Sequence, residues 1–210
     1  MKTRILYKLV GLAAFAGVAM TANAQLLNGG FELGTGADAN NWFRFGNAYR
    51  EAFTPHTGDY TMKMFGNFSG GFNVTGAFQD FAISPGQSAS ASGFGMNLST
   101  DAMSGDNFAL IKLIYRDIGN NDLVAAESAF IKASTPQDVW QSLSASLGAA
   151  PANTHHGSLF MLFIQPDTTP FAGGAAFFDD LSVQVVPEPA SIIALAAGLG
   201  VIGLRRRAAK

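Results

Sequence analysis

The residues best suited to chemistry in this sequence lie in one short aromatic and polar stretch. Trp42, Arg44, Phe45 and Tyr49 stand close together, with Phe43 and Asn47 between them. Aromatic rings stack on the apolar faces of sugar rings, and neighbouring Arg or Asn side chains can bond to the sugar hydroxyls. The stretch therefore predicts a ligand-binding platform for a glycan. The alternative is that Trp42 is a core residue.

Three acidic residues form a second candidate site. Glu32 lies near the start of the chain and the pair Asp179 and Asp180 lies near its end. The two ends of a jelly roll commonly lie side by side, and calcium takes six to eight oxygen ligands, carboxylates among them. Adjacent residues of a regular strand point to opposite faces, so only one of the two aspartates is expected to enter one site. The alternative is carboxylates that bind no metal.

No motif indicates a catalytic centre. His155 and His156 form the one pair of adjacent histidines, and the chain contains neither a Gly-x-Ser-x-Gly elbow nor a His-Glu-x-x-His motif. Paired acids of a glycoside hydrolase cannot be recognised in sequence, because their separation is three-dimensional. We therefore expect a protein that is not an enzyme, with a glycan-cleaving enzyme as the less favoured alternative.

The charge of the chain is unevenly distributed. Residues 25–186 hold six basic and fourteen acidic side chains, a formal charge of −8, while both ends are basic. Proteins that bind nucleic acid need a basic footprint, so a nucleic-acid partner is not expected. Cysteine is absent, which excludes disulfides and thiolate metal sites.

Residues 1–24 have the pattern of a secretory signal peptide. Lys2, Arg4 and Lys8 precede an apolar run from Leu9 to Met20, and Ala22-Asn23-Ala24 supplies small residues for cleavage. The apolar run is shorter than the roughly 20 residues of a spanning helix. We expect an exported chain that begins at Gln25, and an N-terminal membrane anchor is the alternative.

The segment 186–210 combines a rigid tripeptide, a short apolar span and a basic end. Pro187, Glu188 and Pro189 precede fifteen uncharged residues, after which Arg205, Arg206 and Arg207 follow at once. Arginines in this position remain cytoplasmic by the positive-inside rule. The span predicts a transmembrane helix of about 22 Å, which is short for a permanent anchor.

This tail resembles the PEP-CTERM sorting family in the order of its three parts. The resemblance implies processing by an exosortase, together with the secretion machinery, after a transient stay in the inner membrane. It also implies a final location at the cell surface or in the extracellular matrix of a biofilm. An ordinary single-span membrane protein is the alternative.

The body between the two ends, 25–185, has the pattern of β-strands. Alternating or β-rich runs cover 59–65, 87–98, 107–115, 123–133, 139–147, 158–165 and 175–185, and turn residues such as those of 119–122 separate them. No run shows the apolar stripe of a helix. The expected fold is all-β, an antiparallel β-sandwich of the jelly-roll type, flanked by the signal helix and the transmembrane helix.

Two motifs give this body a family likeness. Asn28-Gly-Gly-Phe-Glu32 opens it and Phe177-Phe-Asp-Asp-Leu181 closes it. The segment His56-Thr-Gly-Asp-Tyr60 between them adds a third match. The body resembles carbohydrate-binding modules of the galactose-binding-like type. The resemblance implies a structural calcium ion held by Glu32 and Asp179, with Asp180 in reserve and carbonyls of the Thr57-Gly58 turn as further ligands.

The sequence as a whole predicts an exported, non-catalytic surface or matrix protein. Its expected activity is association with exopolysaccharide or binding of another glycan. A purely structural or adhesive surface protein is the alternative.

Overall fold

The computed structural model of the chain describes residues 26–166, 168–169 and 171–186. The predicted signal peptide and sorting tail therefore lie outside the described residues. Within them the only helical element is one short 3-10 turn, η1 (Ser99–Asp101), and all other regular structure is β-strand. No helix in this part of the chain has the length and apolar character that crossing a membrane requires.

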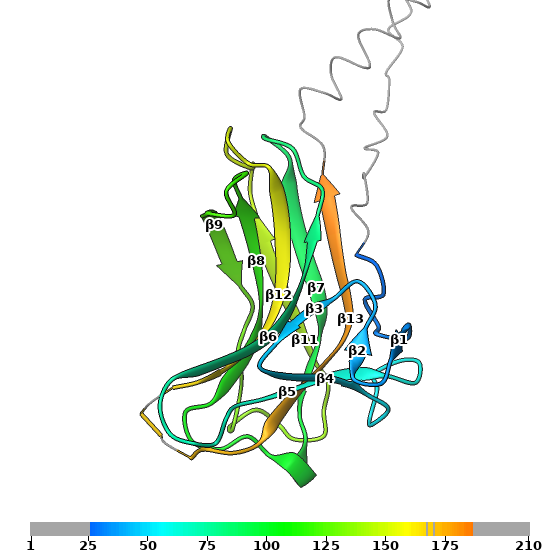
Figure 1. Cartoon of the computed structure of the whole chain (residues 1–210), viewed down its shortest axis with the longest axis vertical. Helices are drawn as coiled ribbons and strands as arrows, with labels where there is room; N and C mark the ends of the chain where they lie inside the picture. The colour runs from blue at the N-terminus through cyan, green and yellow to red at the C-terminus, as the bar shows by residue number, and fades with distance from the viewer. Residues whose placement is uncertain (1–25, 167, 170, 187–210) are drawn as a thin grey trace, which may run out of the picture. The chain divides into compact units, whose positions relative to one another are not determined.

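Two antiparallel sheets pack face to face (Figure 1). The six-stranded sheet has the order β10 (Ile131–Lys132), β8 (Phe108–Arg116), β12 (His156–Gln165), β6 (Asn73–Phe81), β3 (Phe43–Phe45), and β9 (Asp122–Glu127) also pairs with β8. The five-stranded sheet has the order β11 (Gln141–Leu147), β7 (Ser88–Asn97), β13 (Ala175–Val186), β5 (Thr61–Phe65), β4 (Asn47–Glu51). A small hairpin joins β1 (Gly34–Thr35) to β2 (Asp38–Ala39). The predicted antiparallel β-sandwich is confirmed.

Alternation along the strands determines which side chains form the core. In β12 the side chains of Leu159, Met161 and Phe163 are fully buried, whereas Phe160 and Leu162 between them are half-buried. Side chains of a strand point alternately to its two faces, so the first set faces the opposite sheet and the second faces outward. Strand β6 alternates in the same way from Ala77 to Phe81, whereas in β8 only Phe108, Lys112 and Arg116 are partly exposed and the outward Leu110 and Ile114 are buried.

The core lies between the two sheets and is built from large apolar side chains of both. Its fully buried members include Phe31, Met62, Met64, Ile111, Leu113, Tyr115, Leu143, Leu159, Met161, Phe163 and Phe178. Tyr115 also carries a polar group into this layer, and its hydroxyl donates to the carbonyl oxygens of Leu147 and Gly148 at 3.3 and 3.1 Å. Burial raises the pKa of Tyr115. A buried phenol of this kind requires such partners.

The predicted turn at 119–122 is confirmed as the link between β8 and β9. Asn120 has a φ of 63°, a left-handed conformation that Asn tolerates. The Asp117 carboxylate accepts the backbone N–H groups of Gly119 and Asn121 at 2.8 and 2.9 Å. Hydrogen bonds from Asn121 hold the pKa of Asp117 below its usual range.

Candidate functional site

The structure brings the three predicted acidic residues to one place beside the turn 56–60. Asp179 and Asp180 lie in β13 and contact His56 and Thr57, while Glu32 contacts Asp59 and Tyr60. The first and last segments of the body therefore lie side by side, as the sequence predicts. The backbone N–H of Leu181 donates to the carbonyl of Gly29 at 2.9 Å and fixes this approach.

Asp179 is buried and accepts only backbone N–H groups. Its exposed fraction is 0%. Its Oδ2 accepts the N–H of His56 at 2.7 Å and of Thr57 at 3.3 Å, and its Oδ1 accepts the N–H of Asp180 at 2.7 Å. Removal from water disfavours the charged carboxylate and raises the pKa of Asp179 to about 6, although the three N–H donors oppose this shift. Asp179 thus ties the turn to the last strand.

Asp180 departs from the expectation for a regular strand. The pairing of β13 with β7 shifts register between Asp179 and Ser182, and Asp180 has a φ of 51°. Such a bulge re-aims a side chain, so Asp180 turns to the same segment as Asp179 instead of the opposite face. Its Oδ2 lies 2.6 Å from His56 Nδ1, and its Oδ1 accepts the Thr57 hydroxyl at 2.7 Å.

Glu32 meets the same turn from the other side. Its carboxylate accepts the N–H groups of Asp59 and Tyr60 at 3.1 and 3.2 Å. Gly58 has a φ of 65°, and an added Cβ there would lie only 2.3 Å from Glu32 Oε1. A side chain at position 58 would therefore be strained by the left-handed backbone, and the end of the Glu32 side chain would have to move to make room for it.

The oxygen atoms of these acids face N–H and O–H donors, which is not the shell that calcium takes. Across the described residues no three His, Asp or Glu side chains gather so as to hold a metal. A bound calcium ion would have to displace hydrogen bonds that Glu32 and Asp179 make here. Calcium binding stays a prediction of the sequence, and the present arrangement does not fit it.

The predicted aromatic platform does not form one surface. Trp42 has an exposed fraction of 7%, its ring packs 5.3 Å from that of Phe31, and its indole N–H donates to the carbonyl of Asn28 at 2.9 Å. Trp42 is therefore a core residue, which corrects its place in the platform. Arg44 is held by Asp38 and by the carbonyl of Ala48.

Phe45 and Tyr49 lie on different sheets. Phe45 belongs to β3 of the six-stranded sheet, where its ring covers Gly76; a Cβ added to Gly76 would lie 2.5 Å from it. Tyr49 belongs to β4 of the five-stranded sheet and stacks on Phe65 at 5.7 Å. The chain turns between them at Gly46, whose φ is 65°. A role for Arg44, Phe45 or Tyr49 in ligand binding stays a prediction.

A row of phenylalanines crosses the outer face of the six-stranded sheet. Phe43, Phe78 and Phe160 are Cα partners on β3, β6 and β12. Their rings stack, with centroids 5.5 Å apart between Phe43 and Phe78 and 4.8 Å apart between Phe78 and Phe160. Phe43, at the edge, is 67% exposed. The outcome is an apolar strip three strands wide.

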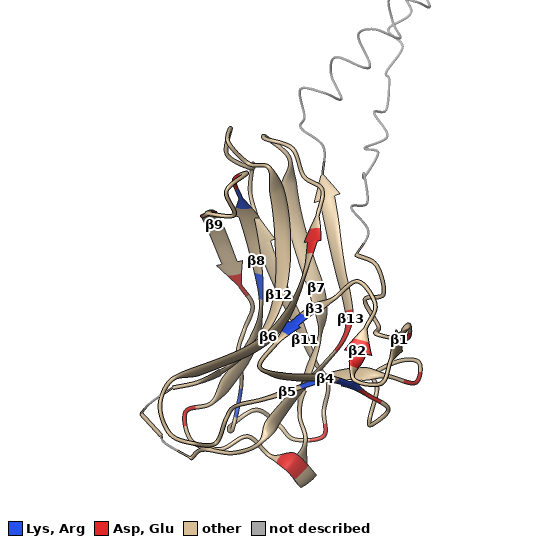
Figure 2. Cartoon of the chain, viewed as in Figure 1, with Lys and Arg blue, Asp and Glu red and all other residues tan. Residues whose placement is uncertain are grey.

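Polar side chains border this strip. Lys112 of β8 is the Cα partner of Phe160, and the Arg116 guanidinium lies 4.9 Å from the Phe160 ring centroid. Both cations also pair with acids of β9, Glu127 at 3.0 Å and Asp122 at 2.8 Å. Figure 2 shows these basic residues on β8 and the acidic residues on β9. The strip is thus an apolar surface with hydrogen-bonding groups along one side.

Asp80 provides an acceptor beside the middle of the same strip, two residues along β6 from Phe78. It accepts the Ser158 hydroxyl at 2.5 Å and lies 4.0 Å from His156 Nε2. His155 and His156 contact each other through their Nδ1 atoms at 3.2 Å. The two histidines lie where β12 begins, beside this face.

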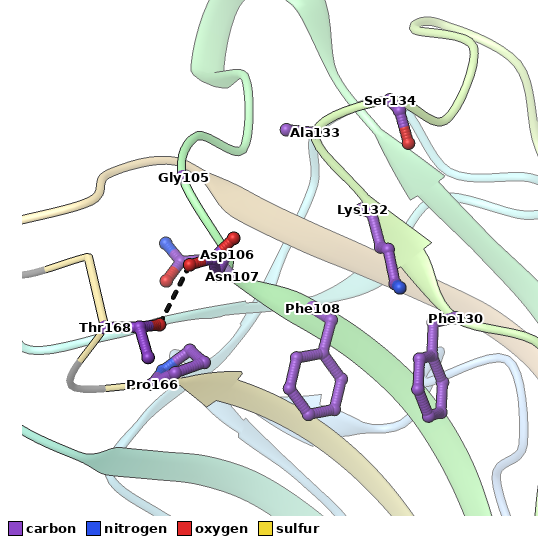
Figure 3. A pocket seen from close by; sticks show the side chains of 10 residues that line it. All are labelled: Gly105, Asp106, Asn107, Phe108, Phe130, Lys132, Ala133, Ser134, Pro166 and Thr168. Carbon is purple, nitrogen blue, oxygen red and sulfur yellow. Dashed lines mark hydrogen bonds between the residues drawn. The ribbon is translucent and has the colours of Figure 1, made fainter.

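A hollow of about 580 Å³ lies at the far end of this outer face (Figure 3). Phe108 of β8 and Phe130 form one wall, with ring centroids 4.9 Å apart, and the Lys132 side chain reaches toward them from β10. Asp106 lies on the opposite wall and accepts the Thr168 hydroxyl at 2.9 Å. Asn107 supports this wall by donating to the carbonyls of Ala172 and Gly173, each at 3.1 Å.

Sequence reasoning missed both the phenylalanine row and the hollow. Each arises from strand pairing, since Phe43, Phe78 and Phe160 are far apart in the chain. A signal was present in the outward positions of β12, where Phe160, Leu162 and Ile164 are apolar although the side chains between them already supply the core. Apolar residues on both faces of a strand indicate that the second face is covered or binds something.

Comparison with solved structures finds the same sandwich in carbohydrate-binding modules. A TmCBM61 structure in complex with β-1,4-galactotriose matches 77% of this chain and 97% of its own, with 15% identity and a TM-score of 0.50. The CBM22-1 xylan-binding domain of Xyn10C from Paenibacillus barcinonensis matches 80% of this chain and 98% of its own, with 16% identity and a TM-score of 0.52.

Some structural neighbours belong to catalytic proteins. The enzymatically active domain of tailspike protein 4 from bacteriophage CBA120 shares 10% identity at a TM-score of 0.53; the match covers 78% of this chain and 21% of that one. No protein-family model matches the sequence, and no curated protein matches it significantly. At these identities the likeness establishes the β-sandwich fold of carbohydrate-binding modules.

Proposed function

We propose that this domain is a non-catalytic glycan-binding module and that its binding surface is the outer face of the six-stranded sheet. The observation that carries the proposal is the stacked row of Phe43, Phe78 and Phe160 on that face. The fold shared with carbohydrate-binding modules supports the same activity.

The physical basis is the match between the strip and a sugar chain. Sugar rings present flat C–H faces that pack on aromatic rings, and their hydroxyls need donors and acceptors alongside. From Phe43 on β3 to Lys112 on β8 the surface crosses three strand spacings, about 14 Å in all. Lys112 and Arg116 supply donors along the row, and Asp80 supplies an acceptor. The strip therefore suits an extended glycan better than a single sugar.

The binding proposal is tested on the purified protein with the exopolysaccharide of its own host. Co-sedimentation with that polysaccharide is compared for the native chain, Phe160→Ala and the control Phe53→Ala, which removes an exposed ring between β4 and β5. We expect Phe160→Ala alone to reduce binding. Equal binding by all three proteins would contradict the proposal, and release of reducing ends would show that the protein cleaves glycans.

We propose further that the domain is exported and sorted to the cell surface or the extracellular matrix, with exosortase as its processing partner. The support comes from the sequence, namely the signal pattern of residues 1–24 and the Pro187-Glu188-Pro189 tail with its terminal arginines. In the native host we expect a secreted form that begins at Gln25 and lacks the arginine cluster. An intact 210-residue chain in the cytosol would contradict this proposal.

The second candidate function is a structural role through self-association, which the edge strand β11 favours. β11 is the outermost strand of its sheet and contains neither a charged residue nor a proline. Its outward positions Ser142, Ser144 and Ser146 are exposed, and the hydroxyl of Ser92 on the next strand pairs with that of Ser182 at 2.8 Å. Edges without charge or proline favour pairing with another strand.

Sedimentation velocity separates this second candidate from the first. Antiparallel pairing of two β11 strands about Ser144 would bring serine opposite serine, so Ser144→Lys would place two like charges together. A concentration-dependent dimer that Ser144→Lys abolishes would support self-association. A monomer at every concentration would exclude it.

A further inference from the structure

The hollow beside Phe108 contains a lysine that forms no ion pair with the described residues, whereas the two cations beside the phenylalanine row are paired with acids. Lys132 lies on its wall, and the ammonium is 5.3 Å from the centroid of the Phe130 ring. Within the described residues no carboxylate lies within ion-pair distance of Lys132. A cation beside two aromatic rings, in a hollow large enough for a sugar, suits a ligand that carries a negative charge.

The other basic side chains of the described residues are engaged. Each of Arg44, Lys63, Lys112 and Arg116 pairs with an acid. Arg50 is buried and donates to the carbonyls of Phe31 and Glu32 at 2.5 and 2.8 Å. Lys132 therefore stands apart in a body whose formal charge is −8.

The hollow continues the proposed binding face. Phe108, Leu110 and Lys112 are alternate residues of β8, so they share the outer side of the sheet. Lys132 is the Cα partner of Phe108 and shares that side. From Phe108 to Lys112 the strand rises about 13 Å. Lys112, Arg116 and Lys132, three of the six basic residues of the body, thus border one surface.

We infer that the ligand of this face is an acidic polysaccharide, and that Lys132 binds the carboxylate of a uronic acid residue seated in the hollow. This inference rests on the proposed glycan-binding function and names its substrate class. Phe108 and Phe130 contact the apolar face of that sugar, while Asp106 and Ser134 on the rim accept or donate bonds to its hydroxyls. Lys112 and Arg116 bind carboxylates of other sugar residues of the same glycan. They can exchange their present partners Glu127 and Asp122 for these carboxylates, because exposed ion pairs are weak.

The charge of the body makes such a site selective. An acidic polysaccharide is repelled by a surface of net negative charge, so it binds only where cations offset the repulsion. A neutral glycan needs no lysine in the hollow. The carboxylate dependence of binding therefore distinguishes the two ligand classes.

The experiment titrates the full chain with a galacturonic acid tetramer and with its carboxyl-reduced form, in which each carboxylate has become a hydroxymethyl group. Isothermal titration is performed with the native protein, Lys132→Met, Lys132→Arg and the control Lys63→Met, which removes a cation of the five-stranded sheet. We expect the acidic tetramer to bind about tenfold more tightly than the reduced one, the size of one charge-assisted contact. Lys132→Met should reduce that preference, because it removes the cation of the hollow, while Lys132→Arg and Lys63→Met should keep it in full.

Two results would overturn the inference and leave the proposed function standing. One is equal affinity for the two tetramers. The other is a preference that Lys132→Met does not change. A different result would contradict the proposed function itself. In that case Phe160→Ala would bind the host polysaccharide as tightly as the native protein does, both before and after the carboxylates of the polysaccharide are reduced.

Discussion

The buried carboxylate of Asp179 accepts the backbone N–H of His56, 123 positions away in the chain, at 2.7 Å. This bond and its neighbours hold the turn 56–60 against the last strand. Asp180 and Glu32 bind the same turn, so three acids from the two ends of the body fix one loop. The acidic motifs at both ends of the body therefore have a structural role in fixing this turn.

The raised pKa of Asp179 predicts a pH dependence of stability. Its pKa is about 6 in the folded protein and 3.8 as the ordinary value, so between these values the folded state binds more protons than the unfolded state. The contribution of this group to stability is therefore present below about pH 4 and is lost as the pH rises to about 6.

The comparison of the native chain with Asp179→Asn isolates this group from the other acids. Urea unfolding in a chelating buffer is measured at several pH values from 4 to 6. We expect the stability of the native protein relative to the variant to fall across that range. A difference that stays constant, or that grows with pH, would show that folding does not raise the pKa of Asp179.

The hydrogen bonds of Glu32 and Asp179 also predict the response to calcium. Since N–H donors already satisfy both carboxylates, the thermal midpoint should be the same in excess calcium and in chelator. A midpoint that rises with calcium, and does not rise in Glu32→Gln, would show that the ion displaces those donors. That result would restore the calcium site which the sequence predicts.

A comparison of Gly58 with Gly36 separates the effect of the Glu32 contact from that of backbone strain. Both have a left-handed backbone, with φ of 65° and 57°, but only at Gly58 does an added Cβ meet Glu32; at Gly36 it meets nothing within 4 Å. Gly36→Ala should cost about 1 kcal/mol of unfolding free energy through backbone strain alone. Gly58→Ala should cost roughly 1 kcal/mol more, because the exposed Glu32 carboxylate must also move away from its hydrogen bonds to Asp59 and Tyr60. Equal losses in denaturant unfolding would mean that the Glu32 contact is unimportant.

The sequence predicted the fold well where the strands alternate. Strands β5, β7, β8, β9, β11, β12 and β13 all lie within or across predicted runs. Strand β6 was missed because Gly76 and Gln79 interrupt its apolar pattern and the preceding segment is rich in glycine. The predicted run 123–133 is two strands, since the chain leaves β8 after Glu127 and pairs with it again at Ile131.

The candidate site was less predictable, for two physical reasons. The bulge that turns Asp180 beside Asp179 depends on a left-handed residue within a strand, which alternation cannot reveal. The stacked row depends on register between strands that are distant in sequence, and it places Phe43 and Phe160 on the two sides of Phe78. The mixture of aromatic and polar residues around Trp42 predicts a place in the platform, with the core as the alternative, and the structure places Trp42 in the core against Phe31.

The claim that a glycan binds the phenylalanine row is tested most directly by two single-ring deletions on opposite sheets. Phe43 is the exposed end of the row, and Tyr49 is an exposed ring of the five-stranded sheet. Affinity for the host exopolysaccharide is measured by isothermal titration with Phe43→Ala and Tyr49→Ala. The account predicts a loss of about fivefold or more for Phe43→Ala, as removal of one stacking ring costs about 1 kcal/mol, and none for Tyr49→Ala. The opposite order would contradict it and would place the binding surface on the other sheet.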